Sequence, residues 1–91
     1  MSATFAMGKF GLRGLAQSMA RELHPQNIHV VHVVVDGGIR SAEKNRIENQ
    51  DDDSDKWLDP EAIASTYWHL HTQHRSSWSW EIELRPWVEK F

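Results

Sequence analysis

The sequence predicts an α/β fold in which helix, strand, helix and strand follow one another and the two strands run parallel. Three observations carry this prediction. Apolar residues recur at helical spacing over residues 3–23, a β-branched run without alternation covers residues 28–35, and strict alternation covers residues 78–84. Since a helical segment at 59–74 joins the last two patterns, the strands form a βαβ unit. The 91 residues make a single domain.

The first helix is expected to run from Ala3 to Leu23. Ser2 or Thr4 can cap its start, and Pro25 ends it because the residue before a proline avoids helical backbone. A helix that is apolar on two sides is expected to pack between two layers or against another subunit. The two apolar stripes are Leu12, Leu15, Ala16, Met19, Ala20 and Leu23 on one side and Ala3, Met7, Phe10 and Gly14 on the other.

The first strand is expected over Ile28–Val35. Its lack of polar alternation is typical of a strand covered on both faces. The strand ends in Asp36-Gly37-Gly38, and the carboxyl edge of a parallel sheet is where α/β proteins often place a ligand.

The stretch from 40 to 58 is polar and charged, so we expect a mobile surface loop there. Asp59 then provides an N-cap and Pro60 occupies the first helical position of a helix that ends near His74.

The last strand is expected over Trp78–Leu84, with Trp78, Trp80, Ile82 and Leu84 on a buried face. Serines, glutamates and an arginine alternate with them, and this charged face favours an edge position. Pro86 ends the strand.

Charge and composition exclude several classes of function. The net charge is -3, so neither nucleic acid nor an anionic membrane is an expected partner. No apolar run approaches the roughly 18 residues of a membrane span. The absence of cysteine excludes disulfides and thiolate metal sites. We therefore expect a soluble, cytoplasmic protein.

Two groups of residues suggest metal binding and are rejected. His69, His71 and His74 lie close in sequence, but His69 and His71 project in different directions from a helix. The acidic run at 51–55 lacks the glycine and the final glutamate of a calcium loop. No metal site is expected.

One arrangement carries a family resemblance. Phe5-Ala6-Met7-Gly8-Lys9 begins the first helix, and Asp36-Gly37-Gly38-Ile39 follows the buried strand. In this order the chain resembles the C-terminal half of a short-chain dehydrogenase/reductase. The first helix resembles the one that carries the family's Tyr-x-x-x-Lys motif. The closing stretch, Asp59 to Ala64 and on through Leu84 to Val88, is similar to one bacterial branch of oxidoreductases.

The resemblance implies a fold and a set of roles. The fold would be the C-terminal fragment of a Rossmann-type domain, with the segment 40–58 in the place of the substrate loop. Lys9 takes the role of the catalytic lysine, which in the family lowers the pKa of the tyrosine and holds the nicotinamide ribose. Phe5 stands at the tyrosine position and has no proton to donate. Asp36, Gly37, Gly38 and Ile39 take cofactor-binding positions, and the backbone of Ile39 matches the one that meets the carboxamide.

Two functions follow from this resemblance. In the first, the chain is part of an NAD(P)-dependent oxidoreductase and is inactive alone, because the glycine-rich nucleotide-binding half is missing. We then expect NAD(P) in the full-length parent and no cofactor on the isolated chain. In the second, the chain is a non-catalytic homo-oligomeric assembly module. A homodimer or tetramer through residues 3–23 and 60–84 is expected, since two strands alone make a poor sheet.

Overall fold

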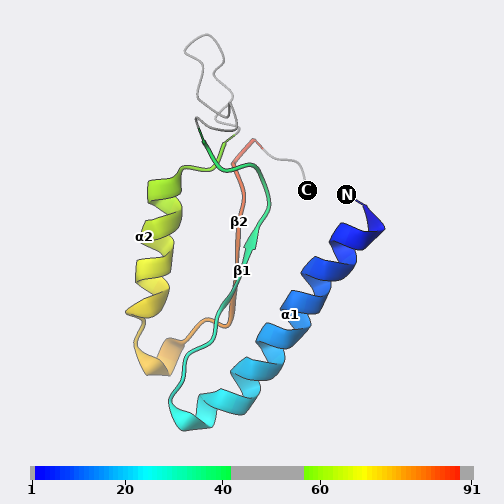
Figure 1. Cartoon of the computed structure of the whole chain (residues 1–91). Coiled ribbons are helices and arrows are strands. Elements are labelled where there is room, and N and C mark those ends of the chain that lie inside the picture. The colour runs from blue at the N-terminus through cyan, green and yellow to red at the C-terminus, as the bar shows by residue number, and fades with distance from the viewer. Residues whose placement is uncertain (1, 42–56, 89–91) are drawn as a thin grey trace. The chain divides into compact units, whose positions relative to one another are not determined.

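The computed structural model describes residues 2–41 and 57–88, and its element order is the predicted one (Figure 1). Helix α1 (Ala3–Leu23) leads through a short 3₁₀ turn, η1 (His24–Gln26), to strand β1 (His32–Val35). Helix α2 (Pro60–His71) leads through a second turn, η2 (Arg75–Ser77), to strand β2 (Glu81–Leu84). The helix, strand, helix, strand prediction is confirmed.

The chain divides into two compact units, and each strand contributes to both. The first unit comprises Met1–His32 and Gln73–Ile82, and the second comprises Val33–Thr72 and Glu83–Phe91. The first unit therefore holds α1 and the amino ends of the strands. The second holds α2 and their carboxyl ends.

Strands β1 and β2 form a two-stranded parallel sheet. The His32 N–H donates to the Trp80 carbonyl at 2.9 Å, and the Asp36 N–H donates to the Leu84 carbonyl at 2.8 Å. From the first bond to the second, both the donor and the acceptor move toward the C-terminus. The two strands therefore run in the same direction, and the predicted parallel pairing is confirmed.

Helix α1 has the predicted bounds. The Ser2 hydroxyl accepts the Phe5 N–H at 3.1 Å and caps the first turn. The exit from η1 uses Asn27 in the left-handed conformation, with φ of 66°, which asparagine adopts more easily than most residues. The stripe that contains Ala20 is covered in part, since Ala20 is buried and Ala16 and Leu23 are half-buried. The stripe that contains Met7 and Phe10 is exposed.

Strand β1 is shorter than the predicted strand. Residues 28–31 lie outside the ladder, because the strand pairing begins at His32. Just before it, the His29 ring bonds to the Ser79 carbonyl through Nε2 at 2.7 Å. A side-chain contact therefore takes the place of the first part of the expected ladder.

Helix α2 begins as predicted but ends earlier. Asp59 caps it by accepting the Glu61 N–H at 3.2 Å, and Pro60 is its first residue. The helix stops at His71, where the Thr72 hydroxyl bonds back to the Trp68 carbonyl at 2.9 Å. The prediction of an end near His74 is wrong because the His74 ring caps η2 instead.

Strand β2 is also shorter than predicted, and its faces differ from the prediction. It starts at Glu81, so Trp78 and Trp80 precede it. Trp80 is 42% exposed, whereas Glu81, expected on the solvent face, is half-buried. The alternation in the sequence therefore does not separate buried from exposed residues here.

The core of the described residues is small. Ala20, Leu70 and Pro86 are its buried apolar residues. No helix in the described parts of the chain is long and apolar enough to cross a membrane.

The predicted loop at 40–58 is described at its two ends only. Ile39 and Leu58 form a parallel bridge, in which the Leu58 N–H donates to the Gly38 carbonyl and the Arg40 N–H donates to the Leu58 carbonyl, both at 2.8 Å. The Arg40 guanidinium also pairs with the Asp59 carboxylate at 2.8 Å. The acidic run at 51–55 and the rest of 42–56 lie outside the described residues.

Candidate functional site

Phe5 and Lys9 lie one turn apart on α1, in the first unit. The Lys9 ammonium is 5.5 Å from the centre of the Phe5 ring, which is a cation–π distance. Both residues are exposed, Phe5 at 54%. No ion pair engages Lys9 among the described residues. The ammonium can therefore donate hydrogen bonds to a ligand.

Asp36 lies at the carboxyl end of β1, in the second unit, and its carboxylate already has a partner. The Arg85 guanidinium approaches Asp36 Oδ2 at 3.2 Å and Glu83 Oε2 at 2.9 Å. Arg85 is well covered, with 17% of its side chain exposed. The carboxyl ends of both strands are thus tied through one arginine.

Gly37 is required by the backbone at this strand end. Its φ of 149° is a conformation that residues with a side chain rarely adopt. A Cβ at Gly37 would lie 2.7 Å from the Cδ of Pro86. This glycine lets the chain leaving β1 pass close to the chain leaving β2.

Ile39 follows with backbone groups that are open to a ligand. Leu58 takes the carbonyl of Gly38 and the N–H of Arg40, so the two residues that flank Ile39 supply the bridge. The N–H and carbonyl of Ile39 itself have no hydrogen-bond partner among the described residues. Its side chain is partly exposed.

The structure brings four of the six candidate residues together. Asp36, Gly37, Gly38 and Ile39 are consecutive at one strand end of the second unit, while Phe5 and Lys9 form their own pair in the first unit.

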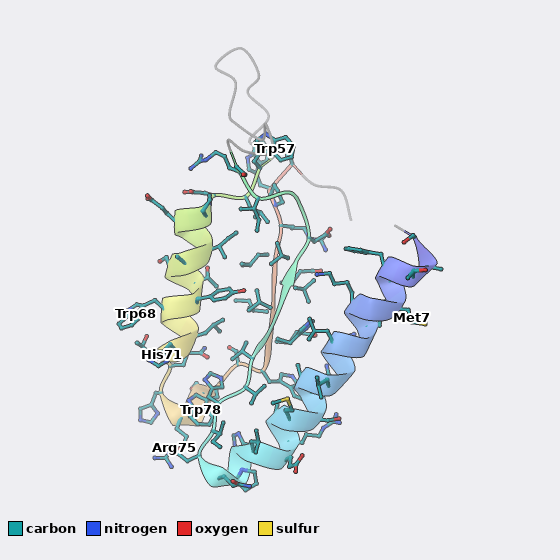
Figure 2. The ribbon with its side chains drawn as sticks, in the orientation of Figure 1. Met7, Trp57, Trp68, His71, Arg75 and Trp78 are labelled. Carbon is teal, nitrogen blue, oxygen red and sulfur yellow. The ribbon has the colours of Figure 1, made fainter. Side chains whose placement is uncertain are left out.

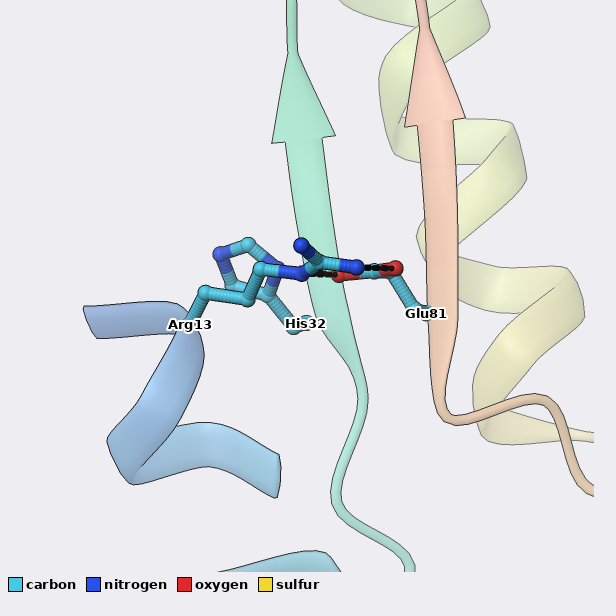
Figure 3. Close-up of polar contacts among 3 residues, drawn as sticks. All are labelled: Arg13, His32 and Glu81. Atoms are coloured by element: carbon cyan, nitrogen blue, oxygen red, sulfur yellow. Dashed lines mark hydrogen bonds and ion pairs between the residues drawn. The ribbon is translucent and has the colours of Figure 1, made fainter. Parts of the chain in front are cut away.

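The first unit holds a charged cluster that the sequence does not predict (Figure 3). Arg13 of α1 makes a two-pronged ion pair with Glu81 of β2, with Nε to Oε1 at 2.6 Å and Nη2 to Oε2 at 2.9 Å. The Nδ1 of His32 on β1 reaches the same Oε1 at 3.2 Å. The hydrogen bonds from Arg13 are the main cause that lowers the pKa of Glu81 below its ordinary value.

This cluster links three elements. The Glu81 side chain is 24% exposed and the His32 side chain is 11% exposed, so both are largely shielded from water. Opposite charges on the first helix and the last strand are a signal in the sequence, but nothing in their spacing shows that the two elements meet.

A second polar group surrounds Trp78 at the turn between α2 and β2 (Figure 2). The His29 ring stacks on Trp78 at 4.4 Å with nearly parallel planes, and the His24 ring meets it edge-on at 5.5 Å. The indole N–H donates to the Gln73 carbonyl at 3.2 Å. The Gln73 side chain in turn holds Ser79 through both its N–H and its hydroxyl. These hydrogen bonds and ring contacts all join parts of the same chain, so their role is structural.

The histidines of α2 are not grouped with other candidate metal ligands in the part of the chain that the structure describes. No group of three or more histidine, aspartate or glutamate side chains that could hold an ion occurs within residues 2–41 and 57–88. His71 lies beside Trp68 at 5.6 Å, and both project from the same side of α2 (Figure 2).

Comparison with known proteins gives one kind of match. No protein-family model matches the chain, and no curated protein matches it. Among solved structures, a short-chain dehydrogenase from Rhodopseudomonas palustris matches with a TM-score of 0.66 and 42% sequence identity. The match covers 93% of this chain and 30% of that chain.

This match supports the resemblance to short-chain dehydrogenases that the sequence suggests. The chain corresponds to less than a third of the dehydrogenase's length. Over nearly all of its own residues, the chain is similar in sequence and in fold to a part of a short-chain dehydrogenase.

Proposed function

We propose that this chain is the C-terminal part of an NAD(P)-dependent oxidoreductase of the short-chain dehydrogenase type, and that the isolated chain does not turn over substrate. The observation that carries the proposal is the similarity to the Rhodopseudomonas dehydrogenase, 42% identical over 93% of this chain. The order of helix, strand, helix and strand supports it, because sequence and fold point to the same relative.

Each unit, taken by itself, holds one group whose chemistry suits the nicotinamide half of such a cofactor. The Lys9 ammonium has no ion-pair partner among the described residues and can donate to the ribose hydroxyls. The backbone N–H and carbonyl of Ile39 have no hydrogen-bond partner among the described residues. A carboxamide has one acceptor and one donor group that could bond to them. When bound, the cofactor would supply the hydride chemistry.

Gly37 and Asp36 have structural roles that do not depend on a ligand. Gly37 is needed for the approach to Pro86, and the Asp36 carboxylate is engaged by Arg85. In this proposal they shape the strand end on which Ile39 is presented, and neither contacts the cofactor through a side chain.

Phe5 limits the chemistry. A phenyl ring cannot donate a proton to a carbonyl oxygen, so the general acid of this type of reaction is missing at its usual position. None of the glycines lies in a turn that leads directly from a strand into a helix, as a pyrophosphate site requires. Gly8, Gly11 and Gly14 lie inside α1, and the chain after Gly37 and Gly38 forms the bridge to Leu58.

Titration of the purified chain with NADH and NADPH tests the claim of inactivity. Quenching of tryptophan emission and energy transfer to the nicotinamide report binding. We expect no saturable change with either nucleotide up to millimolar concentration. Saturable binding would contradict the proposal, because it would mean that this chain builds a nucleotide site without a further domain.

A chimera tests the roles of single residues. The matching segment of the Rhodopseudomonas dehydrogenase is replaced by this chain, and the affinity for NADH and NADPH is measured. We expect Lys9→Met to weaken nucleotide binding, with Arg21→Met on the same helix as the control. Phe5→Tyr is expected to create or raise turnover of carbonyl compounds. Unchanged binding in the Lys9 variant, or unchanged turnover in the Phe5 variant, would remove the proposed role of that residue.

A second candidate function is a non-catalytic assembly module that forms a homodimer or tetramer. The observation that favours it is the exposure of large apolar side chains, including Met7 at 71% and Phe10 at 67% on α1 and Trp68 at 67% on α2. Such surfaces usually mark an interface, and they fall within residues 3–23 and 60–84. A folded monomer in native mass spectrometry at micromolar concentration would contradict this function.

A further inference from the structure

We propose that Arg40 is a positioning residue for the backbone of Ile39. Through its contacts with Leu58 and Asp59, it fixes the direction of the one N–H and the one carbonyl to which a nicotinamide carboxamide would bond. The proposal rests on the proposed function and deepens it by naming the residues that orient this backbone. All of them belong to the second unit.

The peptide planes on both sides of Ile39 set the direction of its backbone groups. The Leu58 N–H donates to the Gly38 carbonyl, and the Leu58 carbonyl accepts the Arg40 N–H, both at 2.8 Å. In a trans peptide the carbonyl and the N–H of one plane point in opposite directions, and the described residues contain no cis peptide. The Ile39 N–H shares a plane with the Gly38 carbonyl, and the Ile39 carbonyl shares one with the Arg40 N–H. Both Ile39 groups therefore point away from Leu58, toward the same side.

This arrangement presents one donor and one acceptor next to each other. A primary carboxamide carries a carbonyl acceptor and an NH₂ donor on one carbon, so it can bond to both groups. An ionised phosphate or carboxylate offers acceptors only, so it would leave the Ile39 carbonyl without a donor. The chemistry of the pair thus favours the nicotinamide end of the cofactor over its phosphates.

Arg40 contacts two consecutive residues across the bridge. Its backbone N–H bonds to the Leu58 carbonyl, and its guanidinium Nη2 lies 2.8 Å from Asp59 Oδ1. A shift of the bridge by one residue would have to break both contacts. The Arg40 side chain therefore adds a second point of attachment beside the bridge.

Asp59 is itself held by the first turn of α2. Its Oδ1 accepts the Glu61 N–H at 3.2 Å, and its carbonyl accepts the Ile63 N–H at 3.0 Å. Arg40 is thus tied to the start of a 12-residue helix. A group that is supported by a helix is held more precisely than one that is supported by a loop.

The exposure of the ion pair determines the size of the expected effect. The Arg40 side chain is 40% exposed and the Asp59 side chain is 44% exposed. An ion pair that water reaches to this extent contributes modestly, so its loss changes an equilibrium by about two- to fivefold. An effect of this size requires matched controls.

Amide hydrogen exchange in the 91-residue chain tests the contact without any nucleotide. Arg40→Met removes the guanidinium, and Asp59→Asn removes the charge but keeps an equally good helix cap. We expect the Leu58 amide to exchange about two- to fivefold faster in each variant, because the bridge opens more often. Circular dichroism verifies that both variants are folded.

Two other amides of the second unit serve as internal controls. The Asp36 N–H bonds to the Leu84 carbonyl, and the Ile63 N–H bonds to the Asp59 carbonyl. Both should exchange at the wild-type rate in the two variants. An unchanged Leu58 amide would overturn the positioning role. Equal acceleration of all three amides would also overturn it, because the variants would then lower stability in general.

The chimera with the Rhodopseudomonas dehydrogenase tests whether the position of Ile39 matters for the nucleotide. Its affinity is measured for NADH and for ADP-ribose, which lacks the nicotinamide. We expect Arg40→Met and Asp59→Asn each to weaken NADH binding about two- to fivefold and to leave ADP-ribose binding unchanged. The double variant should be no weaker than either single variant, because both remove the same contact. Arg40→Lys keeps the charge and should retain most of the affinity for NADH, and Arg75→Met controls for the loss of an exposed arginine.

The two nucleotides distinguish a failure of this role from a failure of the cofactor site. If the wild-type chimera binds NADH no more tightly than ADP-ribose, the carboxamide makes no contact with Ile39, and the cofactor role of Ile39 and the role of Arg40 are both wrong. If the wild type prefers NADH but the variants weaken both nucleotides equally, or neither, the role of Arg40 alone is wrong and the proposed function stands.

Discussion

The two ends of the β1–β2 ladder are held by different physical means. At the amino ends, in the first unit, charged and aromatic side chains make the contacts: Arg13 and His32 on Glu81, and His29 on Trp78. At the carboxyl ends, in the second unit, the backbone of Gly37 passes against Pro86, and one arginine joins Asp36 to Glu83.

This difference indicates how each end responds to sequence change. A side-chain cluster can lose one member and keep its backbone, so its response depends on charge and pH. A close backbone approach accepts no additional atom, so its response depends on volume. The predictions that follow test this distinction.

The largest effect is expected from Gly37→Ala. The added Cβ would lie 2.7 Å from Pro86 Cδ, and alanine rarely adopts the required φ. We expect a loss of about 3 kcal/mol in the free energy of unfolding, from backbone strain together with overpacking. Denaturant titration followed by circular dichroism measures it.

Gly14→Ala is the matched control for this change. Nothing lies within 4 Å of a Cβ at Gly14, which is inside α1. The same substitution should therefore stabilise the protein there, by up to about 1 kcal/mol. If both variants change stability in the same direction, the close approach at Gly37 is not the limiting feature of that end.

A smaller loss is expected from Glu81→Gln, which removes the charge that Arg13 and His32 share. Since Arg13 lowers the pKa of Glu81, the folded state holds the carboxylate ionised to lower pH than the unfolded state does. The stabilisation is therefore fully present above about pH 5 and is lost as the pH falls through the folded pKa. Thermal midpoints of the two proteins should differ at neutral pH and converge in acid.

Arg75→Gln controls for the loss of a charge alone, since this exposed residue lies in η2 and takes no part in the cluster. A difference between wild type and Glu81→Gln that is independent of pH would contradict the electrostatic explanation.

The smallest effect is expected from Asp36→Asn. Its ion pair with Arg85 is partly exposed, with 47% of the aspartate side chain accessible, and Arg85 keeps Glu83 as a partner. The expected loss is about 0.5 kcal/mol. A loss as large as that of Gly37→Ala would mean that the charges at the carboxyl ends, and not the close approach, hold the strands there.

The fold could be predicted from the sequence where one local signal decides the structure. Ser2 and Asp59 cap the helices as expected, and the lack of alternation in β1 correctly indicates a parallel neighbour. The element ends were wrong where two local signals compete. Thr72 ends α2 before His74, and the contact of His29 with the Ser79 carbonyl replaces the first part of the ladder.

The site was predictable only as separate pieces. The sequence places Phe5 one helical turn from Lys9, and places Asp36 to Ile39 at a strand end, and both placements agree with the structure. The Arg13–Glu81–His32 cluster was not predictable, because it depends on which elements meet. The alternation predicts that Glu81 faces solvent, whereas in the structure Arg13 of α1 covers it.

The parallel pairing of β1 and β2 has a consequence for the folding rate. The residues that open the ladder, His32 and Trp80, are separated by about half of the chain. Contacts between such distant residues form late, because the intervening chain must lose its freedom before they give any stabilisation. We therefore expect both helices to form first and Ile28–Val35 to wait unpaired. That β-branched segment would then be the main source of aggregation during synthesis.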